Sequence, residues 1–328
     1  MEKLISVIVA TYKRSEGLIP TLESIRLQEY KNKELIVTDD GSGKEIIEII
    51  DNYLDKFKDD FINVTFVKNE TNLGTVKNVQ NAYKIAKGEI IKILSPGDLF
   101  YDKNVLSYIN HYFSKYSPLI ACGIPRTYHK HGDKVEDDFT YNYSTYFNLN
   151  NTKKTIFNML YASRYIVGAT LVFHQDIFAK HNLFLPDSVI YAEDLIQLYA
   201  VLKGIRIHLL NGYFIWYEHG SGISTNEDAS CLNKLINDNM SFFRWLIDEK
   251  KVDKKTARKI SIKIEILLKS RFPSKMLRYV KDFSFLEYKL QERIGSRTNY
   301  HDAILMKHKT FLDKQKDGFI ELIKKGNA

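Results

Sequence analysis

Acidic and polar side chains follow the apolar runs of this chain at four places, where carboxylates could hold a metal ion or accept a proton. They are Thr11, Tyr12 and Arg14; Asp39 and Asp40; Ser95, Gly97 and Asp98; and Glu193 with Asp194. Taken singly, Asp39, Asp40 and Asp98 are also ordinary helix-capping or turn residues, and Glu193 with Asp194 could complement the dipole at a helix N-terminus. Their repeated placement just after apolar runs is what favours a functional site.

Short β-branched runs alternate with amphipathic helical patterns over the first 125 residues. This alternation predicts βαβ units and a mostly parallel sheet. We expect the strands at residues 6–10, 35–38, 64–67 and 90–94. Because ligands of such sheets bind beyond the carboxyl ends of the strands, the polar residues at those ends should meet at one edge.

The second half of the chain gives weaker signals. Residues 126–155 are polar, rich in tyrosine and without a clear period, so they are interpreted as a surface loop or as part of an acceptor pocket. We expect a strand at 169–173 and a helix at 193–203. A hairpin is expected around Asn211-Gly212, because this dipeptide favours a type I′ turn. From residue 226 onward the pattern is helical.

The net charge of +8 is unevenly distributed. Residues 1–224 carry a net charge of −1, whereas residues 225–328 carry +9, from 23 basic and 14 acidic side chains. We therefore expect a domain over 1–224 and a basic helical extension over 225–328, with an anionic partner. The extension could lie on an anionic membrane surface or pack its apolar face on the body or on another subunit, as in a homo-oligomer. No helix-turn-helix, RRM or KH pattern supports nucleic-acid binding.

The composition excludes several other classes. Apolar residues at 44% and charged residues at 27% are typical of a globular chain. Two cysteines cannot form a disulfide framework or a structural zinc site, and Cys122 is expected to be a buried apolar residue. The apolar run at 4–10 is too short for a signal peptide or a membrane span. We expect a cytoplasmic protein, or one that is peripheral on the inner face of the cell membrane.

Several ordered motifs of the chain resemble the family 2 glycosyltransferases of the GT-A fold. The motifs are SVIVATYKR, ELIVTDDGSGKE and NETNLGTVKNVQNAYKIAKGEIIKILSPGDLF, followed by AEDLIQLYAVLKG and WYEHGSGIS. They cover roughly residues 4–100 and 165–224. The resemblance implies an α/β, Rossmann-like GT-A fold, with a mostly parallel sheet flanked by helices. It implies inverting transfer of a sugar from a nucleotide-diphosphate donor to a saccharide or polyprenyl-diphosphate-linked acceptor, as in cell-surface polysaccharide synthesis.

The resemblance also assigns roles to particular residues. Contacts with the nucleotide sugar are implied for Thr11, Tyr12, Arg14, Asp39, Asp40, Asn72, Lys77, Ser95 and Gly97. A carboxylate that accepts the imide N–H of uracil rejects cytosine, whose N3 carries no proton, and this favours a UDP-sugar. Asp194 would be the general base, with Glu193 beside it as an orienting residue.

The metal motif departs from the family pattern. The family usually has Asp-x-Asp-Asp, whereas here the four positions are 95–98 and only Asp98 is acidic. One aspartate can suffice, because Mg²⁺ or Mn²⁺ is held by one or two carboxylates plus diphosphate oxygens. His219 is the expected second ligand, and it suits Mn²⁺ better. Two other classes stay open: a catalytically impaired relative that binds a nucleotide or a partner, and a nucleotidyltransferase, which would need a Gly-rich loop that ATYKRSEG does not provide.

Overall fold

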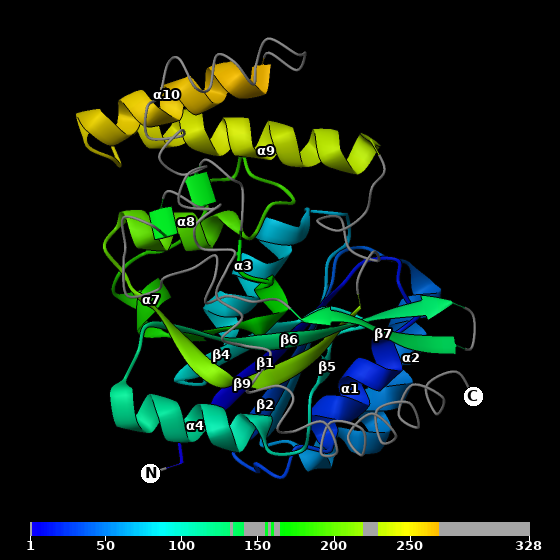
Figure 1. The fold of residues 1–328 in the computed structure, drawn as a ribbon. Coiled ribbons are helices and arrows are strands. Elements are labelled where there is room, and N and C mark those ends of the chain that lie inside the picture. The colour runs from blue at the N-terminus through cyan, green and yellow to red at the C-terminus, as the bar shows by residue number, and fades with distance from the viewer. Residues whose placement is uncertain are drawn as a thin grey trace.

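A mixed β-sheet flanked by helices on both faces forms the body of the protein (Figure 1). The structure is a computed structural model, and it describes residues 2–131, 134–140, 155–156, 159–160, 165–218 and 229–268. Within these residues the sheet has nine strands in the order β3-β2-β1-β4-β8-β6-β9-β5, with β7 paired to β6. The sheet therefore continues well beyond the four strands that the first part of the chain predicts.

The first part of the chain folds as predicted. The strands are β1 (Ile5–Thr11), β2 (Lys33–Asp39), β3 (Asn63–Lys68) and β4 (Ile90–Leu94), and β1 pairs in parallel with β2 and β4 as β2 does with β3. The connecting helices are α1 (Leu18–Arg26), α2 (Lys44–Phe57) and α3 (Thr75–Ile85). The carboxyl ends of these parallel strands consequently meet at one edge.

The remaining elements of the body follow in chain order. They are η1 (Lys58–Asp60), β5 (Leu99–Phe100), α4 (Val105–Tyr116), β6 (Ile120–His131), β7 (Lys134–Thr140), η2 (Gly168–Thr170), β8 (Leu171–His174), α7 (Asp176–Ala179), α8 (Leu195–Leu202) and β9 (Ile207–Glu218). The strand and the helix expected at 169–173 and 193–203 are thus confirmed, with shifted bounds.

The hairpin expected at Asn211-Gly212 is wrong, because both apolar runs belong to the single strand β9. This strand runs parallel to β6, and its pairing shifts between Cys122, opposite Leu209, and Ile124, opposite Tyr213. Between these two pairs β9 advances by four residues while β6 advances by two. Asn211-Gly212 therefore lies in a β-bulge and not in a turn.

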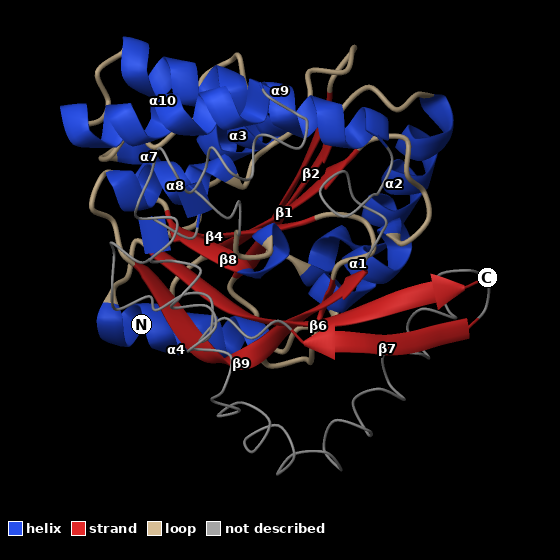
Figure 2. Cartoon of the chain, turned by 45° about the horizontal axis from the view of Figure 1, so that its top comes forward, coloured by secondary structure: helices blue, strands red, loops and turns tan. Residues whose placement is uncertain are grey.

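The loop expected over residues 126–155 is also wrong in its first half. Residues up to His131 continue β6, and β7 pairs with them in antiparallel fashion. The far end of this hairpin extends beyond the rest of the sheet (Figure 2), whereas Thr127 and Tyr128 of β6 are still buried and paired with β9. Residues 141–154 lie outside the described part of the chain.

Side chains of the central strands alternate between two apolar cores, one on each face of the sheet. In β1, Ile8 faces the core shared with α3 and α8, whereas Val7 and Val9 face the core shared with α1, α2 and α4. Figure 2 shows these two helical layers on opposite sides of the strands. Cys122 is fully buried in the first core, as the sequence predicts.

The C-terminal helices α9 (Ala229–Asp248) and α10 (Lys254–Leu268) form an outer layer beyond α8 and α3 (Figure 1). Phe242, Phe243 and Leu246 of α9 and Ile260 of α10 are buried in the same core as α8. The expected packing of the extension against the body is confirmed for these residues. Among the described residues, no helix is long and apolar enough to cross a membrane.

Candidate functional site

Asp40 anchors the loop between β3 and α3. Its buried carboxylate accepts hydrogen bonds from the N–H of Leu73 at 2.8 Å and from Asn69 Nδ2 at 3.3 Å on Oδ1, and from the N–H of Gly74 at 2.9 Å on Oδ2. The carboxylate therefore supports the loop that carries Asn72, one of the expected donor contacts.

Other expected nucleotide contacts lie at the same edge of the sheet. Thr11 ends β1, and its carbonyl accepts the N–H of Asp40 at 2.9 Å. Asp39 ends β2 and is buried, holding the next turn through hydrogen bonds from Ser42. Tyr12 is 43% exposed, and its hydrogen bond with Asn72 lowers the pKa of the phenol. The exposed ring offers a face on which a planar base can stack.

Residues 95–98 form a tight turn directly after β4. The N–H of Asp98 donates to the carbonyl of Ser95 at 2.9 Å, with Pro96 and Gly97 between them, as in a type II turn. Gly97 has a φ of +97°, which this position requires and which glycine adopts without strain. The carboxylate of Asp98 accepts the N–H of Ser95 at 2.9 Å and is 7% exposed. Asp98, the acidic residue among positions 95–98, therefore directs its carboxylate into the protein interior.

A carboxylate from a distant strand lies where a side chain at position 97 would begin. Glu218, the last residue of β9, has its Oε2 at 2.5 Å from Arg14 Nη2. A β-carbon built on Gly97 would overlap this oxygen. Burial raises the pKa of Asp98 to about 7, and the charge of Glu218 adds to the rise. An acidic group is thus present beside the turn, where the resemblance leads one to expect carboxylates at positions 95 and 97.

Glu193 and Asp194 lie immediately before α8. Asp194 is the N-cap residue of this helix, yet its side chain makes no capping hydrogen bond. Oδ1 instead accepts a hydrogen bond from Gln197 Nε2 at 3.0 Å, and Gln197 is itself fixed by the N–H and the carbonyl of Ile166 at 2.9 and 2.7 Å. The carboxylate of Asp194 is therefore held by Gln197 and does not cap the helix.

A cavity of about 50 Å³ connects the two acidic elements. Asp98 lines it from the end of β4, and Glu193 and Asp194 line it from the start of α8. The remaining wall consists mainly of apolar side chains from α3 and from residues 168–173. A space of this size holds a reacting hydroxyl or a few water molecules, so a nucleotide must bind outside it.

Burial at the apolar wall raises the pKa values of the two carboxyl groups before α8. Burial raises the pKa of Glu193, and the neighbouring charge of Asp194 raises it further. Burial also raises the pKa of Asp194, against the hydrogen bond from Gln197, which lowers it. A carboxylate whose pKa lies closer to neutrality is a better proton acceptor for a hydroxyl group.

The structure gathers the expected residues into two neighbouring groups. Thr11, Tyr12, Asp39, Asp40 and Asn72 meet at the ends of β1 and β2, whereas Asp98, Glu193 and Asp194 share the cavity. Arg14 and Gly97 adjoin the second group through Glu218. Ser95, exposed directly after β4, also lines this cavity, whereas Lys77 is exposed on the first turn of α3. His219 lies outside the described residues.

Four further residues near the site were missed by the sequence reasoning: Glu218, Gln197, Lys92 and Tyr165. Lys92 is fully buried in β4, where its ammonium donates to the carbonyls of Ala169 and Leu171, and burial lowers its pKa to about 7. A lysine inside the apolar run IIKIL was the signal that could have found it. The Tyr165 hydroxyl, whose pKa is raised by burial and by the charge of Asp194, has no hydrogen-bond partner among the described residues.

The mixed sheet, its flanking helices and the carboxylates at its edge define a GT-A, Rossmann-like glycosyltransferase fold. Residues 6–181, just over half of the chain, match the family described as Glycosyl transferase family 2. The chain belongs to this family. The resemblance in the motifs is thereby confirmed at the level of fold and family.

Curated relatives are similar to part of the chain. GlyG, a glycosyltransferase of Streptococcus pneumoniae, is 34% identical over 99 residues, which are 30% of this chain and 32% of GlyG. The Escherichia coli UDP-Glc:alpha-D-GlcNAc-diphosphoundecaprenol beta-1,3-glucosyltransferase WfaP is 32% identical over 126 residues, 34% of this chain and 48% of WfaP. A poly-beta-1,6-N-acetyl-D-glucosamine synthase of Staphylococcus epidermidis is 35% identical over 127 residues, 38% of this chain and 29% of the synthase. The matched segments thus span less than half of each relative.

Solved structures are similar over nearly the whole chain. Residues 1–349 of Staphylococcus aureus TarS, in complex with UDP-GlcNAc, superpose with a TM-score of 0.55 at 17% identity, covering 98% of this chain and 90% of the other. The mannosyltransferase PcManGT of Pyrobaculum calidifontis, in complex with GDP-Man and Mn²⁺, gives 0.52 at 12% identity, covering 100% and 87%. At such identities the likeness shows the shared fold alone.

Proposed function

We propose that this protein is an inverting glycosyltransferase that moves a sugar from a nucleoside-diphosphate donor to a hydroxyl group of a saccharide or lipid-diphosphate-linked acceptor. The observation that carries the proposal is the placement of Asp194, whose carboxylate is held by Gln197 and faces the same cavity as Asp98. An inverting transfer needs a single base on the side opposite the leaving group, and Asp194 supplies that base.

The proposed reaction is a single displacement. Asp194 takes the proton of the acceptor hydroxyl while the oxygen forms a bond to the anomeric carbon. The bond from that carbon to the diphosphate oxygen breaks at the same time, and its electron pair leaves with the nucleoside diphosphate. The raised pKa of Asp194 suits this proton transfer, and Glu193 orients the acceptor beside it.

The donor that we propose is a UDP-sugar. The uracil base is proposed to lie at the ends of β1 and β2, beside Asp39, Asp40 and Tyr12. One of the two aspartates would accept the N3–H of uracil. UDP-Glc in the name of WfaP and UDP-GlcNAc in a TarS complex support this assignment. Lys77 and Arg14 are proposed to contact the ribose or the phosphates.

A divalent cation, Mn²⁺ or Mg²⁺, is proposed to bind at the turn of residues 95–98, close to Asp98 and Glu218. Asp98 and Glu218 provide hard oxygen ligands, and Glu218 fills the space of the missing motif side chain. Among the described residues no three His, Cys, Asp or Glu side chains gather around a possible metal position, and we propose that the diphosphate supplies further ligands. His219 is the further ligand expected from the sequence. When bound, the cation stabilises the charge on the leaving diphosphate.

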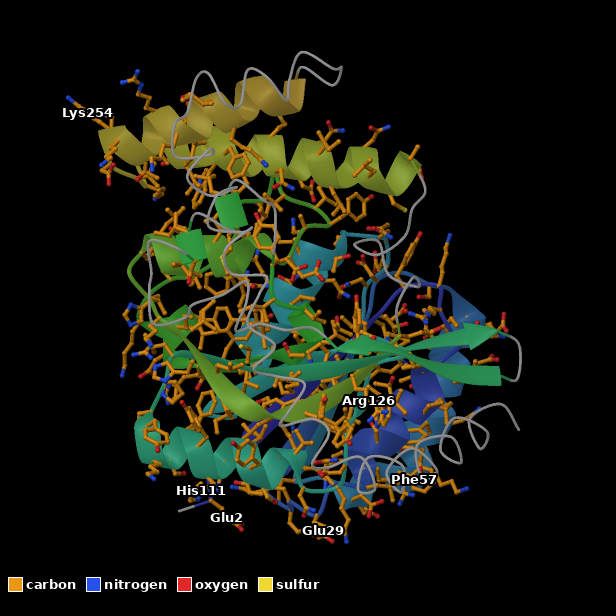
Figure 3. All side chains as sticks on the ribbon, in the orientation of Figure 1. Glu2, Glu29, Phe57, His111, Arg126 and Lys254 are labelled. Carbon is orange, nitrogen blue, oxygen red and sulfur yellow. The ribbon has the colours of Figure 1, made fainter. Side chains whose placement is uncertain are left out.

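The acceptor that we propose belongs to cell-surface polysaccharide synthesis at the inner face of the membrane. The names of WfaP, with its diphosphoundecaprenol acceptor, and of the N-acetylglucosamine polymer synthase support this class. Lys254, Lys255 and Arg258 are exposed on α10, and Lys254 projects from the outer side of the helical layer (Figure 3). These cations suit an anionic membrane surface that carries such an acceptor.

Nucleotide release from a panel of nucleotide sugars tests the proposal. With Mn²⁺ and saccharide acceptors we expect UDP release, reduced about 10²–10⁴-fold in Asp194→Asn, as is typical of a lost general base. Asp98→Asn should also lose activity, whereas Asp187→Asn, at an exposed site, should not. Unchanged turnover in Asp194→Asn would overturn the assignment of the base.

The degenerate turn at 95–98 favours a second candidate, a relative that binds nucleotides without transferring sugar. In that case UDP would bind in a calorimetric titration, but no donor would be consumed with any acceptor of the panel. Donor consumption that depends on Asp194 excludes this candidate.

A further inference from the structure

Asp238, on the C-terminal helix α9, holds the backbone that leads into the proposed base. It is 4% exposed, and its Oδ2 accepts hydrogen bonds from three consecutive backbone N–H groups, of Ile190 at 3.1 Å, Tyr191 at 2.5 Å and Ala192 at 2.8 Å. The next two residues in the chain are Glu193 and Asp194. One buried carboxylate oxygen therefore fixes the segment just before the catalytic pair.

This segment has little regular structure of its own. Residues 190–192 belong to no helix or strand, so their N–H groups need acceptors from elsewhere. If Glu193 or Asp194 supplied these acceptors, its carboxylate would turn toward the backbone and away from the cavity. Asp238 supplies the acceptor from a different helix, and both side chains stay available for the acceptor hydroxyl.

The same segment is held from its other side by the donor-binding half of the protein. The carbonyl of Ile190 accepts the N–H of Val76 at 2.9 Å, at the start of α3. Gly74 approaches so closely that a β-carbon there would overlap the Ile190 side chain. Asp40 therefore holds Gly74, and Gly74 lies against Ile190. Asp238 holds Ile190 from the other side, so these contacts link the proposed donor edge to the segment before Asp194.

The helix that carries Asp238 cannot shift freely, because it is bound to α8 by its aromatic side chains. The ring of Tyr199 on α8 contacts Phe242 and Trp245 of α9 edge-on, with centroid distances of 6.3 and 5.1 Å. Phe243 and Leu246 are buried in the same core. The position of Asp238 relative to α8 is therefore set by packing.

We propose that Asp238 is a positioning residue for Asp194, so that α9 belongs to the acceptor side of the active site and is not an appendage. This inference rests on the proposed function, because it gives Asp238 a task only if Asp194 is the base. Asp238 touches neither substrate in this arrangement and acts through the backbone of residues 190–192.

The test compares Asp238→Asn and Asp238→Ala with Asp248→Ala, a matched control at an exposed position of the same helix. We expect Asp238→Ala to lower kcat about 10- to 100-fold while the affinity for UDP stays within about twofold, since small displacements of a catalytic group have effects of this size. Amide hydrogen exchange at residues 191 and 192 should accelerate in the same variant. Asp248→Ala should behave as the unmodified chain.

Asp238→Asn keeps the shape and one acceptor oxygen but loses the charge, so it should lower kcat by a smaller factor of about 3 to 10. If Asp238→Ala does not fold, the kcat and the amide exchange of Asp238→Asn test the inference instead. Turnover and exchange equal to those of Asp248→Ala, or a loss of UDP affinity as large as the loss of kcat, would overturn the inference. Asp194→Asn is measured in parallel, because full activity there would overturn the proposed function while leaving the exchange result as it is.

Discussion

Arg14 and Glu218, which are 204 positions apart in the chain, form an ion pair of 2.5 Å directly beside Gly97. Gly97 belongs to the turn at 95–98, where the resemblance implies a metal motif with two more carboxylates than this chain has. The ion pair therefore brings both a cation and a carboxylate to the place where the motif is degenerate. The ion pair can lie this close to the turn only because position 97 is a glycine, since a β-carbon there would overlap Glu218.

Replacement of Gly97 by alanine should be costly for two separable reasons. Its φ of +97° disfavours any β-carbon, and that carbon would also overlap Glu218. Gly43 is a matched control, because its φ is +107° but an added β-carbon would meet no atom within 4 Å. We expect Gly97→Ala to lower the free energy of unfolding by about 1–3 kcal/mol more than Gly43→Ala, as measured in urea. Equal losses would contradict the steric role of Glu218.

Metal binding should depend on both the nucleotide and Glu218. We expect Mn²⁺ to bind weakly to the protein alone and more than about tenfold more tightly with UDP, because the diphosphate completes the ligand shell. Glu218→Gln should remove most of this gain in a calorimetric titration. Arg14→Gln breaks the same ion pair but keeps the carboxylate, so with UDP at a saturating concentration for each variant it should leave Mn²⁺ affinity equal or higher. If both variants lose Mn²⁺ binding alike, Glu218 is not a metal ligand.

The stability of the unliganded protein should decrease as the pH rises toward neutrality. Burial raises the pKa of Glu193 and Asp194 in the folded chain, whereas unfolding returns each to its ordinary value of about 4. Between the ordinary and the raised pKa the folded chain binds more protons, so its free energy of unfolding falls with rising pH. We expect a lower Tm at about pH 7.5 than at about pH 5 from this contribution.

Asp194→Asn isolates that contribution, because the amide does not titrate. The fall of Tm over this pH range should be smaller in Asp194→Asn than in the unmodified protein, and Asp187→Asn should leave it unchanged. A steeper fall in Asp194→Asn would contradict the raised pKa of this carboxyl group.

Binding to anionic membranes should depend on the exposed cations of α10. Each basic residue near such a surface contributes about 1 kcal/mol, so changing Lys254, Lys255 and Arg258 to glutamate should strongly reduce sedimentation with phosphatidylglycerol vesicles. The affinity for UDP should not change. The matched control changes three exposed lysines of the body, Lys44, Lys58 and Lys87, to glutamate. Equal losses in both triple variants would show a general effect of charge and contradict a specific role of α10.

Membrane binding cannot be tested cleanly by deleting everything after residue 224. Such a deletion is expected from the charge distribution to leave donor binding intact. However, it would remove Phe242, Phe243 and Leu246 from the core shared with α8, and Asp238 with them. Surface charge changes avoid this loss of structure.

The parallel half of the sheet could be predicted because its strands carry their own signal. The strand predicted at 90–94 is found with the same bounds, since Ile90, Ile91 and Leu94 are buried and form a nearly continuous apolar run. Asn211-Gly212 misled the prediction, because turn propensity is local whereas a bulge depends on the partner strand. Gly123 on β6 makes that pairing possible, since a β-carbon there would overlap the ring of Phe214.

The sequence by itself determined the residue types at the strand ends, the family motifs and the excess of basic residues after 224. These are local properties, set by spacing along the chain and by the chemistry of each side chain. Only the tertiary structure decided that Glu218 lies beside Gly97 and that Asp238 holds the segment before Asp194. Such contacts join residues far apart in the chain, and they arise when strand pairing and helix packing bring those residues together. The tertiary structure therefore decided that α9 and the first part of α10, which the sequence marks only as basic and helical, contribute buried side chains to the core shared with α8.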